Sequence, residues 1–249
     1  MLKNCVVLFA VLAMSGLASA NFVNGPIVAP INDPSHGFTL QEVIDAGGIR
    51  VGDKVFDLFT VNNSKSDGAQ APDPSGIVVY GVQIPDQVNG ELGLRFTGGW
   101  SAVGGQVADS VIMFRVQADR PWLISDNSLW MDAYGARNGG QVSISENVFA
   151  ADPLTGFTPS LADKFVYFAN RGDNQKYDHQ EFTNAQGELV ALPVIWVVKD
   201  IVVSGGPRES GGAGLSQFYQ TFSQIPEPAS MMLLVVGGLL ASVRKHRRS

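Results

Sequence analysis

The stretch Lys54-Val-Phe-Asp-Leu-Phe-Thr-Val61 carries apolar side chains on both faces of an extended chain. Side chains two residues apart lie on the same face of a strand. One face therefore carries Val55, Phe59 and Val61, and the other carries Phe56 and Leu58. β-branched and aromatic residues also fit a pleated, half-buried surface. The stretch predicts a strand buried between two layers of the domain.

Comparable runs recur along the chain between clusters of glycine, asparagine and aspartate. They are residues 76–84, 91–97, 110–118, 141–149, 164–169, 189–203 and 215–223. Many short strands separated by turn residues are typical of sandwiches and barrels. We therefore predict an all-β fold, an antiparallel β-sandwich or jelly-roll-like single domain over residues 21–225. A closed barrel is the alternative, and the periodicity does not separate the two.

One short helix is predicted over residues 39–45. Thr39 suits the N-cap, and Glu42 follows it three residues later, which is the pattern of a capping box. Gly47 and Gly48 then end the helix.

The N-terminus has the three parts of a secretory signal peptide. Lys3 gives a positive start, residues 5–12 are apolar, and Ala18-Ser19-Ala20 is a small-residue cleavage site. We predict export through Sec-type machinery and cleavage by signal peptidase after Ala20, so residues 1–20 are removed. The only cysteine, Cys5, leaves with them, and the mature chain then relies on its apolar core without disulfides.

The C-terminus also has three parts. Pro226-Glu227-Pro228 cannot continue a helix or a sheet ladder, so an extended, accessible segment is expected there. Residues 229–243 are apolar and would form a helix of about 22 Å, which is short against a hydrocarbon core of about 30 Å. The basic residues behind them would stay on the cytoplasmic side and leave the body outside. We predict a transmembrane sorting helix that anchors the chain only transiently.

This tail, residues 226–249, resembles the PEP-CTERM protein-sorting signal of Gram-negative bacteria. The resemblance implies an address that an exosortase-type membrane protease reads and removes, followed by delivery to the cell surface or extracellular matrix. It assigns a sorting and processing role to Pro226, Glu227, Pro228, Arg244, Lys245, Arg247 and Arg248.

The body resembles a recurring class of PEP-CTERM passengers. The shared features are Gly-x-x-x-Gly-Asp-Lys-x-Phe at residues 48–56, Val-x-Lys-Asp-Ile at 197–201 and Gln-Thr-Phe-Ser-Gln at 220–224. The resemblance implies an all-β passenger with no assigned catalytic residues.

The mature body is acidic. Of the 17 Lys and Arg residues five lie in the two targeting segments, and of the 23 Asp and Glu residues only Glu227 does, which leaves a net charge of −10. Nucleic acid is therefore not expected as a partner. Anionic polysaccharide would be repelled unless divalent cations bridge it to the protein.

The candidate catalytic and metal-binding residues are few. The body holds only His36 and His179, and it has no Gly-x-Ser-x-Gly elbow for a nucleophile. Asp173, Asp178 and Glu181 are possible calcium ligands, but they lack the spacing of an EF-hand loop. Two distant histidines without cysteine also disfavour zinc. We predict no catalytic, cofactor-binding or metal-binding residues.

The tryptophans could stack on sugars, since an exposed indole face suits a pyranose ring. Trp196 lies within an apolar run and is predicted to be core. Trp100, Trp122 and Trp130 lie near turns where they could be exposed, but core packing is favoured for them as well, because Trp is highly buried on average. The leading hypothesis is a non-enzymatic exported surface or matrix protein. The alternatives are a module that binds carbohydrate or exopolysaccharide and, after it, a secreted hydrolase with a pair of carboxylates.

Overall fold

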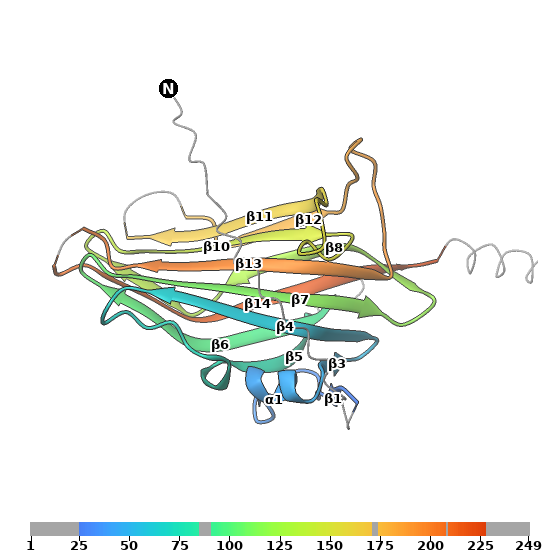
Figure 1. Cartoon of the computed structure of the whole chain (residues 1–249), viewed down its shortest axis with the longest axis horizontal. Helices are drawn as coiled ribbons and strands as arrows, with labels where there is room; N and C mark the ends of the chain where they lie inside the picture. Colours follow the sequence, from blue (N-terminus) through green and yellow to red (C-terminus); the bar gives the residue numbers. More distant parts are fainter. Residues whose placement is uncertain (1–24, 85–90, 171–173, 208, 228–249) are drawn as a thin grey trace, which may run out of the picture.

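The computed structural model describes residues 25–84, 91–170, 174–207 and 209–227. These residues form two facing β-sheets (Figure 1). The first sheet has the order β1 (Ile27–Val28), β3 (Ile49–Val51), β4 (Lys54–Lys65), β7 (Val107–Ala118), β13 (Val194–Ser204), β10 (Gln141–Phe149) and β11 (Ser160–Ala169). The second has β12 (Tyr177–Glu181), β8 (Trp122–Met131), β14 (Gly212–Pro226), β6 (Glu91–Val103), β5 (Val78–Ile84) and β2 (Phe38–Thr39), with β9 (Tyr134–Arg137) paired to β14.

The predicted all-β sandwich is confirmed. All strand pairs are antiparallel except β1 with β3. Aromatic side chains from both sheets meet in the core, where the ring centroids of Phe56 on β4 and Phe222 on β14 are 5.8 Å apart. A 3₁₀ turn, η1 (Pro74–Gly76), and one helix complete the described residues.

The helix α1 (Leu40–Asp45) lies at the edge of the sandwich (Figure 1). It begins as predicted, because the Thr39 hydroxyl accepts from the Glu42 amide while the Glu42 carboxylate accepts from the Thr39 amide. In the part of the chain that the structure describes, no helix is both long and apolar enough to cross a membrane. The predicted signal peptide, residues 1–20, and sorting helix, residues 229–243, lie outside the described residues.

The strand quoted at the outset, β4, has one covered face rather than two. A bulge places Leu58 at a φ of 53°, with its side chain 43% exposed. The bulge reverses the alternation, so Phe56 and Phe59 both enter the core although they are three residues apart. The prediction of two covered faces was wrong because strict alternation does not pass through a bulge.

An ionic network lies inside the sandwich, where the sequence predicted apolar packing. Glu146 on β10 pairs directly with Lys164 on β11 and Lys199 on β13, and all three side chains are fully buried. The Lys164 ammonium lies 2.9 Å from the Glu146 carboxylate. From the second sheet, Asn127 donates to Glu146 at 2.6 Å and accepts from Lys164, and Gln220 accepts from Lys199. The network thus bonds the two sheets together.

Burial and ion pairing shift the pKa values of Glu146 and Lys199 in opposite directions. Burial would raise the pKa of Glu146, but the ammonium groups of Lys164 and Lys199 hold it below its usual value. Burial lowers the pKa of Lys199 to about 8, against the opposing effect of Glu146.

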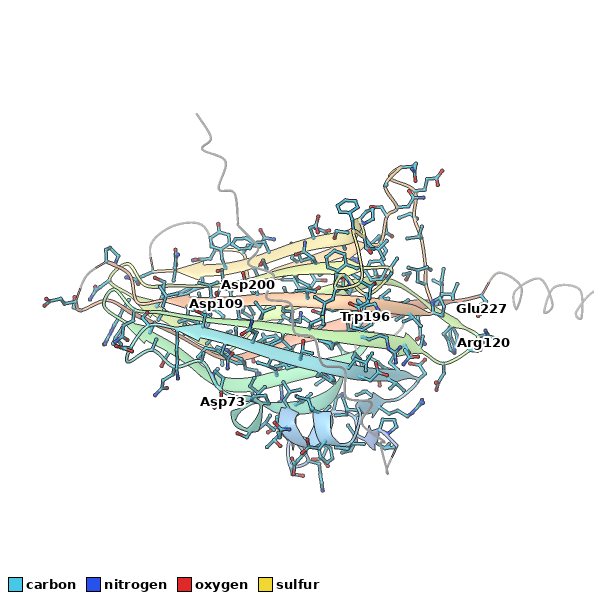
Figure 2. All side chains as sticks on the ribbon, in the orientation of Figure 1. Asp73, Asp109, Arg120, Trp196, Asp200 and Glu227 are labelled. Atoms are coloured by element: carbon cyan, nitrogen blue, oxygen red, sulfur yellow. The ribbon has the colours of Figure 1, made fainter. Side chains whose placement is uncertain are left out.

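The last strand continues further than predicted. Pro226 at the end of β14 still pairs with Trp122, and the Glu227 amide donates to the Pro121 carbonyl at 2.7 Å. Figure 2 shows Glu227 beside Arg120 at the end of the sandwich. Proline lacks a donor but can end an edge of a ladder, so the first two residues of the tripeptide stay attached to the body.

Candidate functional site

A row of large side chains crosses the outer face of the second sheet. Cross-strand neighbours point to the same side of a sheet. Tyr177 pairs with Trp130, Trp130 with Tyr219, Tyr219 with Arg95, and Arg95 with Tyr80, on five adjacent strands. We call these five residues the aromatic row. Their neighbours along each strand point into the core, as Phe96 and Phe218 do.

The rings of the aromatic row hold one another in place. Trp130 and Tyr219 are stacked, with centroids 4.6 Å apart and planes 9° apart. Tyr177 is tilted against Trp130 at 6.4 Å and is 45% exposed. The Arg95 guanidinium lies 3.9 Å from the centre of the Tyr80 ring. The row is therefore pre-formed, half-buried and open to solvent on one side.

A pocket of about 280 Å³ adjoins the Arg95 end of the row. Asn32 is fixed there by two hydrogen bonds of 2.9 Å to the Gln83 backbone. The Nε of Arg95 is buried and donates no hydrogen bond within the described residues. The pocket thus places the Arg95 guanidinium and the Asp33 carboxylate beside aromatic rings.

A second group on the same face joins two carboxylates and an imidazole. The donor atoms of Glu91, Asp126 and His179 all lie within 4.8 Å of one another, and we call these residues the acid–histidine cluster. A cavity of about 480 Å³ opens onto them. Glu91 is 3% exposed and accepts hydrogen bonds from the hydroxyls of Thr221 and Ser223, the latter at 3.1 Å.

Ser35, His36 and Asp33 lie together on the surface but do not form a catalytic triad. The Ser35 hydroxyl donates to Asp33 at 2.6 Å. The hydrogen bonds from the Ser35 hydroxyl and the Ser35 amide, together with the one to His36, lower the pKa of Asp33 to about 2. Both Ser35 and Asp33 contact Nδ1 of His36, at 3.0 and 2.6 Å. A triad needs them on opposite ring nitrogens.

The core prediction is confirmed for Trp100 and wrong for Trp196. Trp100 is 1% exposed and donates to Ser110 inside the core. Trp196, predicted to be core, is half-buried on the outer face of the first sheet near Arg115 (Figure 2). Trp122 is half-buried at the start of β8, opposite Pro226 of β14, and Trp130 is the one tryptophan in the aromatic row.

Asp178 and Glu181, which the sequence offers as possible calcium ligands, lie on opposite faces of β12. The Asp178 carboxylate accepts from the Phe165 amide at 2.9 Å, whereas Glu181 is exposed on the opposite face of β12. Asp173 lies outside the described residues. So do the signal cleavage residues Ala18 and Ala20 and the sorting residues Pro228, Arg244, Lys245, Arg247 and Arg248.

Two carboxylates approach each other on the outer face of the first sheet, Asp109 on β7 and Asp200 on β13 (Figure 2). Burial and the neighbouring Asp109 raise the pKa of Asp200 to about 6. A raised pKa in the folded state means that this group stabilises the protein below about pH 4, and that the stabilisation is lost as the pH rises through 6.

Asp200→Asn should therefore remove the repulsion between the Asp200 and Asp109 carboxylates, which destabilises the wild type only near neutral pH. At pH 7.5 we expect the variant to melt about 2–4 °C higher than the wild type. The increase is small because the group is only half-buried and solvent screens its charge. At pH 4 we expect no increase, because Asp200 is then protonated and neutral in the wild type as well. Thermal melts of the exported protein from pH 4 to 7.5 measure this. Asp67→Asn, in an exposed loop, is the control. A variant with the same pH dependence as the wild type would contradict the prediction.

Comparison with known proteins identifies the tail. Residues 224–248 match the model of the PEP-CTERM protein-sorting motif. The chain has no match among curated protein sequences.

Solved structures resemble the sandwich only distantly. TmCBM61 in complex with beta-1,4-galactotriose is 11% identical, with a TM-score of 0.26, covering 66% of this chain and 88% of that chain. A carbohydrate-binding module structure from the β-sandwich superfamily is 10% identical, with a TM-score of 0.31, covering 82% and 63%. The family 11 module of a Clostridium thermocellum cellulase is 11% identical, with a TM-score of 0.20, covering 67% and 87%. Similarities this low do not assign a ligand.

Proposed function

Since the chain is exported and sorted through a PEP-CTERM motif, we propose that it is a non-enzymatic cell-surface or extracellular-matrix protein that binds exopolysaccharide. The motif indicates transient membrane anchoring, processing by an exosortase, and then surface or extracellular release. Sec-type export and removal of residues 1–20 by signal peptidase complete the proposed route. The observation that carries the binding proposal is the aromatic row.

The aromatic row suits a polysaccharide for three reasons. Tyrosine and tryptophan offer apolar surface together with a hydroxyl or N–H that can bond sugar hydroxyls. The row crosses five adjacent strands, a length of about 19 Å at about 4.8 Å per strand, which accommodates an extended chain. Its rings are already stacked, so binding would cost little side-chain freedom. The Arg95 pocket adds polar groups at one end.

Trp130→Ala and Tyr219→Ala should each weaken binding to the host's own exopolysaccharide by about tenfold or more. The substitutions remove half of a stacked pair, and central aromatic residues dominate binding surfaces of this kind. Affinity electrophoresis in gels that contain the polysaccharide measures the loss as reduced retardation.

Trp196→Ala is the matched control, since it removes another half-buried tryptophan from the outer face of the opposite sheet. It should retain wild-type retardation. Equal retardation of all three variants would contradict the binding proposal. Release of new reducing ends from the polysaccharide would instead support a secreted hydrolase.

A further inference from the structure

We propose that the acid–histidine cluster binds one divalent transition-metal ion of the Zn²⁺ or Mn²⁺ class. The three residues come from three different strands, Glu91 from β6, Asp126 from β8 and His179 from β12. Sheet register brings them together, because Asp126 pairs with Ser223 on β14 and with Glu181 on β12. The proposal concerns a separate site from the aromatic row and goes beyond polysaccharide binding.

One carboxylate oxygen in the cluster is withdrawn from water without a hydrogen-bond donor. The Oδ1 of Asp126 is buried and accepts no hydrogen bond within the described residues. The Nδ1 of His179 lies 3.9 Å from it, which is beyond hydrogen-bond distance. A buried acceptor left unpaired is unfavourable. A cation between this oxygen and the imidazole would supply the missing partner of the carboxylate.

The remaining contacts orient the ligands as an outer layer of a metal site does. The hydroxyls of Thr221 and Ser223 hold Glu91 in place. The Ser128 hydroxyl lies 3.0 Å from Nδ1 of His179, and an ion bound at that nitrogen would replace this hydrogen bond. The nearby positive group is Lys54, which is buried and donates to Gln224 at 2.7 Å and to Asp53 at 3.2 Å. This one ammonium interacts with three carboxylates, those of Asp53, Glu91 and Asp126, so a net negative charge remains at the cluster for the ion.

The donor types select the class of metal. Calcium and magnesium take oxygen ligands almost exclusively. One imidazole nitrogen and two carboxylate oxygens instead suit a zinc-like ion with three protein ligands and an open position. Here the open position would face the cavity of about 480 Å³. The sequence predicted no metal ligand because these residues are 35 or more positions apart along the chain.

Metal addition to the chelator-treated exported protein tests the proposal. With Zn²⁺ or Mn²⁺ at about 100 times its Kd, we expect a melting temperature about 5–10 °C higher and one ion bound per chain by titration calorimetry. Glu91→Gln, Asp126→Asn and His179→Gln should each lose the shift while melting normally without metal.

Two further variants separate the possible outcomes. Glu181→Gln, which lines the same cavity outside the cluster, should retain the metal shift. Trp130→Ala should retain it too, so failure of the polysaccharide proposal would leave this result unaffected. The proposal is overturned if neither Zn²⁺ nor Mn²⁺ stabilises the wild type, if only Ca²⁺ does, or if the three cluster variants keep the shift.

Discussion

Glu146→Gln should lower the free energy of unfolding by about 3–5 kcal/mol, the largest loss that we expect from one substitution. Glu146 is the only carboxylate that contacts Lys164 and Lys199 among the described residues. Glutamine is similar in shape but neutral, so two ammonium groups would stay in the core without a counter-charge. Melting should fall by roughly 10 °C in a domain of this size.

The buried lysines also predict how the defect depends on pH. Without the carboxylate, the folded state would favour neutral lysines, so the stability deficit should shrink as the pH rises toward 10. Replacing all three residues at once, with Glu146→Leu, Lys164→Met and Lys199→Met, should cost less than the single change. Melting of Glu146→Gln within about 2 °C of the wild type would show that the network does not hold the sheets together.

Replacing Pro226, Glu227 and Pro228 together by Ala should abolish processing and leave the chain in the membrane at precursor size. In the proposed route, the change removes the tripeptide by which the exosortase would recognise the chain. Alanine keeps the backbone positions by which residues 226 and 227 attach to Trp122 and Pro121, so the body should melt as the wild type does. Immunoblots of membrane and extracellular fractions measure the accumulation.

The adjoining residue supplies the control for this experiment. Ile225→Ala changes an exposed side chain next to the tripeptide and should be processed normally. Deleting residues 244–248 should instead let the tail pass through the membrane and give unprocessed protein in the periplasm. Mass spectrometry of the released wild type decides the matter, because a C-terminus at Ser249 would refute processing.

Local sequence patterns predicted much of the fold. The capping box of Thr39 and Glu42 fixed the start of the helix, since its hydrogen bonds join residues three apart. Runs of β-branched and aromatic residues predicted most long strands, because the preference of these residues for a strand is also local in the sequence. The bulge at Leu58 was missed because nothing in the local sequence marks where β4 gains a residue against β7.

The position of a charged residue within an alternating strand pattern could have predicted the buried network. On β13, Lys199 alternates in phase with Val197, Ile201 and Val203, which all face the core. Trp196 is out of phase with them and therefore points outward. The phase of the alternation was a better guide than the polarity of either residue.

The aromatic row and the acid–histidine cluster could not be predicted from the sequence. Each depends on how β12, β8, β14 and β6 align, and one residue of slip would turn every side chain to the other face. Asp126 and His179 are 53 positions apart, so only the sheet order makes them neighbours.

The attachment of Glu227 to Pro121 has a mechanical consequence. In the sequence, only Pro228 separates Glu227 from the apolar residues 229–243, so in the proposed anchored precursor a pull would act on the end of β14. Because β6 and β8 both pair with β14, the pull loads two ladders whose bonds lie across the direction of force. Many hydrogen bonds are then loaded together in shear instead of breaking one at a time, so the tethered body should resist unfolding by a pull on this end of the chain.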